Sequence, residues 1–238
     1  MNRARFVGIK AVIIDLDGTM LDTAPDFQAA INAMRSDLHL PPLSINTIKD
    51  FVGKGSENLI RRVLAVDYDD TQVALRFDGA LASYQRHYLS INGDFASLYP
   101  NVREGLAQFK QQSLRLACVT NKPIAFALPL LEKVGLRESF DVIYGGDSLP
   151  TKKPDPGPFL QVCSDFALMP SQVLAIGDSS NDALAARAAG CVVLTVPYGY
   201  NHGESVQTID SDGIVDSLLD AARLLQTSDD YDTAENAN

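Results

Sequence analysis

The stretch from residue 11 to residue 23, Ala-Val-Ile-Ile-Asp-Leu-Asp-Gly-Thr-Met-Leu-Asp-Thr, limits the possible folds more than any other part of the chain. A short apolar run leads directly into two carboxylates, Asp15 and Asp17, which a single leucine separates. Such a run is typical of a buried strand, and α/β proteins place their ligands at the carboxyl ends of parallel strands. We therefore expect Asp15 and Asp17 at the carboxyl edge of a sheet, where a metal site belongs.

The second half of the chain predicts a parallel sheet. Short apolar runs that indicate strands alternate with helical periodicity, and strands joined by helices form parallel sheets with right-handed crossovers. Strands are expected over residues 6–14, 114–119, 140–144, 173–176 and 192–196, with a short one within 212–216. Helices are expected over residues 102–111, 124–134, 158–166, 182–189 and 217–225.

Between about residues 26 and 89 the pattern is helical, and no strand of the Val-Ile type interrupts it. Further helices are expected over residues 25–38 and around residues 59–64. The clearest helix carries six apolar side chains at spacings of three or four residues, which places them on one stripe: Val73, Phe77, Leu81, Tyr84, Tyr88 and Ile91. Such a stripe indicates packing and not a cofactor site, so we expect an inserted helical bundle.

Composition excludes several classes of function. The chain has 238 residues, of which 46% are hydrophobic, and this is enough for one large domain or for a domain with an insertion. The 20 Lys and Arg residues against 30 Asp and Glu give a net charge of −10 without a basic patch, which argues against binding to nucleic acid or to an anionic membrane. No apolar run approaches the roughly 20 residues of a membrane-spanning helix, and no signal peptide is indicated, so we expect a cytoplasmic protein.

The cysteines and histidines give no sign of a metal site. Cys118, Cys163 and Cys191 are widely spaced, which favours reduced thiols in the core over disulfides or zinc ligands. The three histidines, among them His202, have no partner at ligand spacing and are interpreted as surface residues.

Polar side chains suited to catalysis follow the predicted strands. Three motifs come directly after apolar strands, and a lysine stands in a loop that could reach them: Asp15 with Asp17, Thr120 with Asn121, the run from Gly177 to Asp182 that contains Asp178, and Lys153. Each motif alone is more often a turn, a cap or a solvated loop. A parallel sheet would bring all of them to one edge, and this convergence indicates a functional site.

The residue types at this edge favour phosphoryl transfer. Carboxylates without histidine or thiolate suit a hard cation such as Mg²⁺, which prefers oxygen ligands. The cation and a lysine would neutralise an anionic substrate, so that one carboxylate could attack phosphorus and form an aspartyl-phosphate. A second carboxylate could protonate the leaving oxygen and later deprotonate water.

The four motifs, in this order, resemble those of the haloacid dehalogenase superfamily, and the resemblance spans roughly residues 8 to 225. It implies an α/β fold with a Rossmann-like parallel-sheet core and an inserted all-helical cap domain. The implied core consists of residues 1–22 and 93–227, and the implied cap of residues 23–92. Residues 228–238 contain acids and no base, and we expect a disordered acidic tail there.

The resemblance also implies a role for each motif. Asp15 would be the nucleophile and Asp17 the general acid and base, while Lys153 would hold the charge of the phosphoryl group. Thr120 and Asn121 would bind the phosphate. Mg²⁺ would be bound by the Asp15 carboxylate, the Asp17 backbone carbonyl and Asp178, with Asp182 supporting these ligands from behind.

Two further segments resemble the phosphoglycolate phosphatases: Gly53-Lys54-Gly55-Ser56 in the cap, and residues 196–201 after the last long strand. A loop with two glycines around Lys54 would let backbone amides and one cation close on a small anion, although a plain turn between two helices is an equal alternative for Lys54. The expected function is Mg²⁺-dependent hydrolysis of 2-phosphoglycolate to glycolate and phosphate, by a monomer or homodimer.

Alternatives remain open at this point. The substrate could be a sugar phosphate, a nucleotide or pyrophosphate, or the chain could be a catalytically silent binding protein on the same fold. A mutase similar to β-phosphoglucomutase would share Asp15 and Asp17, but such mutases carry a Thr-Arg-x-Gly cap loop where this chain has Phe-Val-Gly-Lys-Gly at residues 51–55. Dehalogenation is disfavoured, because dehalogenases of this superfamily lack an acid at the position of Asp17 and a halide leaving group needs no proton.

Overall fold

The computed structural model describes residues 6–225, so the predicted acidic tail lies outside the described residues. Six strands of the described chain form one sheet in the order β5-β4-β1-β6-β7-β8, and every neighbouring pair is parallel. The strands are β1 (Ala11–Ile14), β4 (Arg115–Val119), β5 (Val142–Tyr144), β6 (Val173–Gly177), β7 (Val192–Thr195) and β8 (Gly213–Ile214). The α/β prediction is confirmed.

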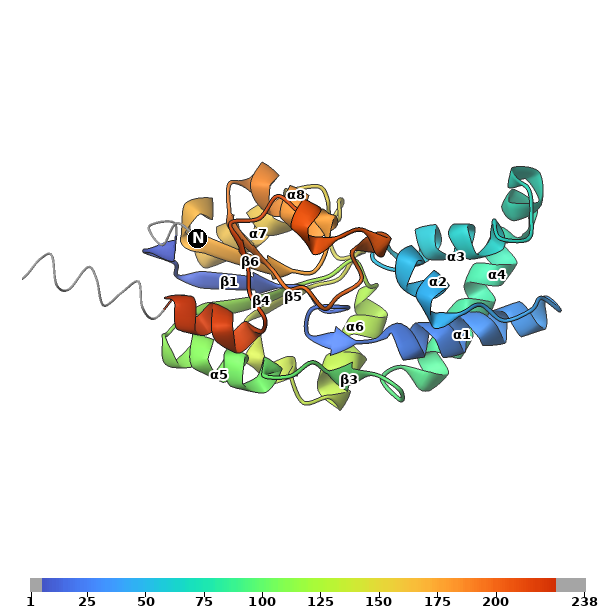
Figure 1. The fold of residues 1–238 in the computed structure, drawn as a ribbon, viewed down its shortest axis with the longest axis horizontal. Coiled ribbons are helices and arrows are strands. Elements are labelled where there is room, and N and C mark those ends of the chain that lie inside the picture. The colour runs from blue at the N-terminus through green and yellow to red at the C-terminus, as the bar shows by residue number, and fades with distance from the viewer. Residues whose placement is uncertain (1–5, 226–238) are drawn as a thin grey trace, which may run out of the picture.

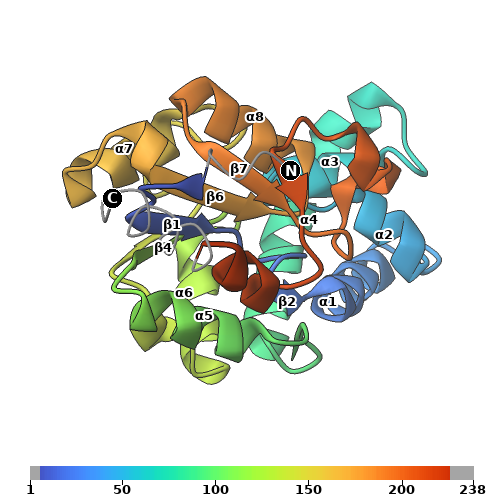
Figure 2. The same ribbon diagram turned by 60° about the vertical axis from the view of Figure 1, so that its left-hand side comes forward.

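Helices cover both faces of this sheet (Figure 2). One face is covered by α5 (Val102–Gln111), α6 (Ile124–Lys133) and the helical residues 218–225, and the other by α7 (Gly157–Phe166) and α8 (Ser180–Ala189). Successive side chains of a strand point to opposite faces. In β1, Val12 and Ile14 accordingly pack toward α5 and α6, whereas Ala11 and Ile13 pack toward α7 and α8.

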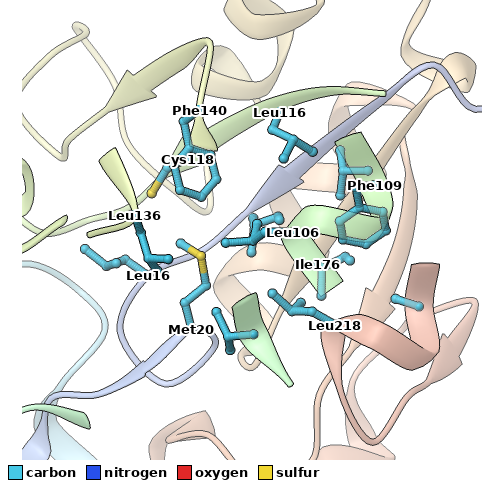
Figure 3. Close-up of a cluster of buried hydrophobic side chains, with 14 of the residues drawn as sticks. Leu16, Met20, Leu106, Phe109, Leu116, Cys118, Leu136, Phe140, Ile176 and Leu218 are labelled. Atoms are coloured by element: carbon cyan, nitrogen blue, oxygen red, sulfur yellow. The ribbon is translucent and has the colours of Figure 1, made fainter. Parts of the chain in front are cut away.

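The loop that follows β1 is anchored in the apolar core (Figure 3). Leu16, which separates the two aspartates, is fully buried in the cluster that also contains Leu106, Phe109 and Leu218. Met20 enters the same cluster and is also 0% exposed. Because Leu16 is held in the core, its neighbours Asp15 and Asp17 are fixed at the carboxyl edge of the sheet, where both line the same cavity.

Four helices, named here the cap helices, fill residues 24–91 and lie together beyond the carboxyl edge of the sheet (Figure 1). They are α1 (Ala24–Asp37), α2 (Ile45–Phe51), α3 (Ser56–Leu64) and α4 (Asp70–Ile91). Val73, Phe77, Tyr84 and Tyr88 of the predicted stripe are buried in one cluster between these helices, as expected. No helix within residues 6–225 has the length and apolar character to cross a bilayer.

The two chain crossings between the sheet and the cap helices are tied to each other. The short strand β2 (Leu21–Asp22) pairs antiparallel with β3 (Ser97–Leu98). In the first turn of α1, the buried carboxylate of Asp26 accepts hydrogen bonds from the backbone N–H groups of Gly93, at 2.7 Å, and Phe95, at 2.8 Å. The division into a core and a cap at residues 22/23 and 92/93 stays a prediction.

Two predicted strands begin two or more residues later in the structure. The strand expected over residues 6–14 begins at Ala11, because residues 6–8 form a turn in which Gly8 has a φ of +75°. The strand expected over residues 140–144 begins at Val142. Phe140 instead closes the 3₁₀ turn Arg137–Ser139, because its backbone N–H donates to the backbone carbonyl of Arg137. The three cysteines are free and buried, as predicted.

Candidate active site

The carboxyl ends of three neighbouring strands bring the predicted motifs together. Ile14 is in register with Cys118 of β4 on one side and with Ile176 of β6 on the other, so the three strands end at the same edge. One cavity at this edge is lined by six of the predicted core residues: Asp15, Asp17, Thr120, Asn121, Lys153 and Asp178. Asp182 lies directly behind them and is 2% exposed.

Lys153 is the central cation of the site. Its Nζ lies 2.7 Å from Asp15 Oδ1, and it donates hydrogen bonds to Asp182 Oδ1 at 2.7 Å and to the backbone carbonyl of Val119 at 2.7 Å. Burial acts to lower the pKa of Lys153, but Asp15 and Asp182 outweigh it and raise the pKa above its usual range. The side chain is therefore a fixed positive charge beside Asp15.

Three buried carboxylates lie close together, those of Asp15, Asp178 and Asp182. One oxygen atom of each lies within 4.8 Å of the other two. Burial, together with the neighbouring Asp182, raises the pKa of Asp15 to about 7 against the attraction of Lys153. Burial and the other two carboxylates also raise the pKa of Asp178 well above its usual value. One lysine does not balance three such groups, and a divalent cation would relieve their repulsion.

The donor set of this cluster fits a hard cation. Asp15 Oδ1 is paired with Lys153 Nζ at 2.7 Å and has no further hydrogen-bond partner among the described residues. Asp182, by contrast, is already engaged, because Oδ2 accepts from the hydroxyl of Ser179 at 2.7 Å and Oδ1 from Lys153. Carboxylate oxygens without histidine or thiolate are the ligands that Mg²⁺ prefers.

Gly18 gives Asp178 the space that it occupies. Its φ of +87° is in the left-handed region, and a Cβ at this position would lie 2.3 Å from Asp178 Oδ2. The neighbouring Thr19 donates its hydroxyl to Asp178 Oδ1 at 3.1 Å. The Asp-Gly-Thr segment after β1 thus positions the carboxylate that follows β6.

Asp17 is held by Lys122, which is absent from the residues predicted from sequence. Lys122 is 5% exposed, and its Nζ donates to both carboxylate oxygens of Asp17, at 2.9 and 3.2 Å. The hydroxyl of Thr23 adds a third hydrogen bond at 2.7 Å. The Nζ also lies 4.3 Å from the ring centroid of Phe27 in α1. Its place in Thr-Asn-Lys-Pro, directly after β4, is the signal that could have identified it.

Tyr200 connects Asp178 to residues 22–23, where the chain passes from the sheet to the cap helices. Its backbone N–H donates to Asp178 Oδ2 at 2.6 Å, and its hydroxyl donates to Asp22 Oδ1 at 2.5 Å. The same hydroxyl accepts from the backbone N–H of Thr23 at 2.7 Å. Tyr200 belongs to the segment 196–201 that was singled out in the sequence, and through it this segment contacts Asp178 and Asp22.

The cap helices form the opposite wall of the cavity, which is mostly apolar. Phe27, Val52, Leu59 and Tyr84 line it, and Phe126 of α6 joins them. The backbone carbonyl of Gly53 accepts hydrogen bonds from the side chains of Asn121, at 3.0 Å, and Asn181, at 3.2 Å, so the loop before α3 rests on the sheet edge. The cavity has a volume of about 40 Å³, which is room for a few waters or a small metabolite.

The structure places Lys54 and His202 differently from the other candidates. Lys54 is exposed and is not among the residues that line the cavity, and its role in substrate binding stays a prediction. The surface interpretation is wrong for His202, which lines the cavity and lies 3.1 Å from Asn181 Nδ2 through its Nε2. Burial, with the charges of Lys54 and Arg62, lowers the pKa of His202, which favours the neutral imidazole. Its sequence context contains no ligand-spaced partner that would have revealed this position.

The chain is similar to known proteins over most of its length. The model of the haloacid dehalogenase-like hydrolase family matches residues 12–196. A phosphoglycolate phosphatase of Nitrosospira multiformis is 49% identical over 220 residues, which cover 92% of this chain and 97% of that protein. A phosphoglycolate phosphatase of Thiobacillus denitrificans is 47% identical, over 91% of this chain and 96% of that protein. A crystal structure of a predicted phosphoglycolate phosphatase from Haemophilus somnus has a TM-score of 0.86 and 34% identity, and covers 92% of this chain and 98% of the other.

Proposed function

Because this chain belongs to the haloacid dehalogenase-like hydrolase family, we propose that it is a Mg²⁺-dependent phosphatase that hydrolyses 2-phosphoglycolate to glycolate and phosphate. The relatives named phosphoglycolate phosphatase support this substrate, since the similarity extends over nearly the whole chain. The observation that carries the proposal is the placement of Asp15 against Lys153, with Asp17 lining the same cavity. This arrangement supplies a nucleophile, a fixed cation and a second carboxylate.

In the proposed reaction Asp15 is the nucleophile. Its carboxylate attacks the phosphorus atom, the bond from phosphorus to the glycolate oxygen breaks, and an aspartyl-phosphate forms. Water then attacks the phosphorus of this intermediate, releases phosphate and regenerates the carboxylate. Lys153 Nζ, 2.7 Å from Asp15 Oδ1, neutralises charge on the transferred group in both steps.

Asp17 serves as the general acid and base. It gives its proton to the departing glycolate oxygen, which would otherwise leave as a poorly stabilised alkoxide, and it takes a proton from the attacking water in the second step. Lys122 and Thr23 fix the orientation of its carboxylate through three hydrogen bonds. Such fixing keeps the proton-transfer geometry ready before the substrate arrives.

The remaining core residues bind the phosphate and the cation. The Asp15 carboxylate, the Asp17 backbone carbonyl and Asp178 would hold Mg²⁺, which when bound supplies positive charge for the phosphoryl oxygens. Asp182 supports the site through Lys153. Thr120 Oγ1 accepts from the backbone N–H of Lys122 at 3.1 Å, so its own proton can be donated to phosphate, and Asn121 lines the same cavity.

We propose that residues 1–22 and 93–227 act as the catalytic core and residues 23–92 as a cap that excludes water during the reaction. Lys54 is exposed on the cap loop beside the cavity, close enough to His202 to affect its pKa. From that position Lys54 would attract an anionic substrate toward the cavity.

A panel of phosphorylated metabolites, ranked by kcat/KM with Mg²⁺ and again with excess chelator, tests this function. We expect 2-phosphoglycolate to rank first and chelation to abolish turnover. A sugar phosphate or nucleotide well ahead of 2-phosphoglycolate would overturn the substrate, and no turnover of any ester with Mg²⁺ would favour the silent binding protein.

A further inference from the structure

The cap wall of the cavity contains backbone donors that the protein itself does not use. Helix α3 begins at Ser56, after Gly55 with a φ of +88°, and no side chain caps it. Leu59 is the first residue of the helix whose N–H finds an acceptor, the carbonyl of Gly55 at 3.1 Å, so the amides of residues 56–58 have none among the described residues. Free amides at a helix start carry partial positive charge, and both Gly55 and Ser56 line the cavity.

A second donor faces the same place. Tyr84 of α4 lines the cavity and is 0% exposed, and its hydroxyl is buried without a hydrogen-bond partner among the described residues. Ser56, the first residue of α3, is near enough to influence its pKa, although not in hydrogen-bonding geometry. Burial raises the pKa of Tyr84 well above its usual value, so the group stays an uncharged O–H. A buried hydroxyl without a partner costs free energy, which a ligand atom would recover.

We propose that the start of α3 and the Tyr84 hydroxyl form a carboxylate subsite in the cap. Because Asp15 and Tyr84 line one small cavity, a short molecule can place its phosphate against Asp15 and its acid group against these donors. The phosphate end of this placement rests on the function proposed above. The subsite needs no contact with Lys54, and it makes Tyr84 and the first amides of α3 the groups that distinguish a phosphorylated carboxylic acid from other phosphate esters.

The chemistry of the subsite selects a negative acceptor. The free amides of α3 can only donate, the Tyr84 hydroxyl has a proton to donate, and the flanking Phe27 and Leu59 are apolar. An uncharged methyl group at this position would leave the donors unpaired, and discrimination of this kind is strong because buried polar groups lose their partners.

The test compares 2-phosphoglycolate with ethyl phosphate, which has the same chain length and no carboxylate. The readout is the ratio of kcat/KM for the two esters. We expect the wild-type ratio to be large and Tyr84→Phe to lower it by roughly ten- to a hundredfold, the range for one hydrogen bond to a charged group. Tyr88→Phe is the matched control, because the Tyr88 hydroxyl is also buried without a partner on the same helix but does not line the cavity. In this control the ratio should not change.

A second variant guards against loss of folding. Ser56→Asp places an acid in the first turn of α3, which favours the helix while it competes with the substrate for the free amides. We expect the ratio to fall at least about tenfold with the melting temperature unchanged or raised. A wild-type ratio near one, or a ratio that neither Tyr84→Phe nor Ser56→Asp lowers, overturns the subsite.

A binding measurement separates this proposal from the proposed function. Titration calorimetry with Mg²⁺ on the Asp15→Asn protein, with and without Tyr84→Phe, measures the affinity for each ester without turnover. Tighter binding of 2-phosphoglycolate than of ethyl phosphate, lost with Tyr84→Phe, supports the subsite even if the wild type hydrolyses neither ester, in which case only the proposed function fails. Equal affinity for the two esters overturns the subsite even if the wild type is an active phosphatase.

Discussion

The two walls of the cavity are built differently. On the core wall the charged groups are held by contacts inside the protein: Lys153 contacts Asp15 and Asp182, and Lys122 contacts Asp17. Asp178 accepts hydrogen bonds from the Thr19 hydroxyl and the Tyr200 N–H. On the cap wall the side chains are mostly apolar, and the first amides of α3 and the Tyr84 hydroxyl have no acceptor among the described residues. The core wall is therefore fixed before a substrate arrives, whereas the cap wall receives its partners from the substrate.

This difference has an energetic reason. Burying several charges is costly, and only close pairing with good hydrogen bonds offsets the loss of hydration. A preorganised charged wall then stabilises the transition state without rearrangement, because its dipoles and charges already point at the reacting atoms. Unpaired donors in a mostly apolar wall discriminate between substrates instead. Substitutions in the core should thus reduce turnover of every ester, and those in the cap should change the order of preference.

The largest effect is expected for Asp15→Asn. We expect kcat to fall by roughly four to six orders of magnitude for every ester, because the nucleophile is lost. The melting temperature should not fall, since burial already penalises the charge of Asp15 and Lys153 keeps Asp182 as a partner. Asp147→Asn is the matched control: Asp147 is an exposed acid that accepts from the N–H of Ile124 at 2.8 Å, and asparagine can do the same. Substantial turnover by Asp15→Asn would show that Asp15 is not the nucleophile.

A smaller and substrate-dependent loss is expected for Asp17→Asn. Removing a general acid lowers rates by roughly a hundred- to ten-thousandfold when the leaving group needs a proton. An aryl phosphate has a good leaving group, so its first step should suffer less than that of 2-phosphoglycolate. Single-turnover rates for the two esters check this, and equal losses for both would contradict the role of Asp17 as the acid.

Gly18→Ala tests the connection between the first motif and the cation. The added methyl group would lie 2.3 Å from Asp178 Oδ2, so this carboxylate must move. We expect the Mg²⁺ concentration for half-maximal activity to rise at least about tenfold, as for other changes that disturb metal ligands from behind. Gly8→Ala provides the control, because Gly8 also has a positive φ, of +75°, but a Cβ there meets nothing within 4 Å. If both variants need the same Mg²⁺ concentration as the wild type, Gly18 has no part in the cation site.

The smallest effect is expected for Lys54→Ala. An exposed charge near the cavity should change kcat/KM for 2-phosphoglycolate by about threefold or less, and the change should disappear at high salt because the field of an exposed charge is screened. Lys10→Ala, an exposed lysine at the opposite edge of the sheet, should have no effect at any salt concentration. A large, salt-independent loss with Lys54→Ala would show that Lys54 contacts the substrate directly.

The core could be predicted from the sequence because each of its motifs follows an apolar strand. Parallel pairing sets the order of strand ends, so the positions of Asp15, Thr120 and Asp178 follow from their places after β1, β4 and β6. Lys122 was missed because a lysine in a loop is usually solvated, and only the structure shows it 5% exposed beside Asp17.

The cap was less predictable for a physical reason. Helical periodicity identified Tyr84 as a buried residue, but periodicity does not distinguish a ring in the core from one whose hydroxyl reaches a cavity. His202 was misplaced likewise, since a short polar loop gives no sign of the element against which it folds. The separate helix α2, which Ser44 caps, was also not resolved from the sequence.

The most direct test of the central claim is to trap the intermediate. The protein is mixed with Mg²⁺ and 2-phosphoglycolate, quenched in acid within one turnover, and digested for mass spectrometry. The account predicts that the peptide containing Asp15 gains the mass of one phosphoryl group, that the gain disappears in Asp15→Asn, and that it persists longer in Asp17→Asn, where activation of water is slow. Phosphorylation of another residue, or turnover without any phosphorylated peptide in the wild type, would contradict it.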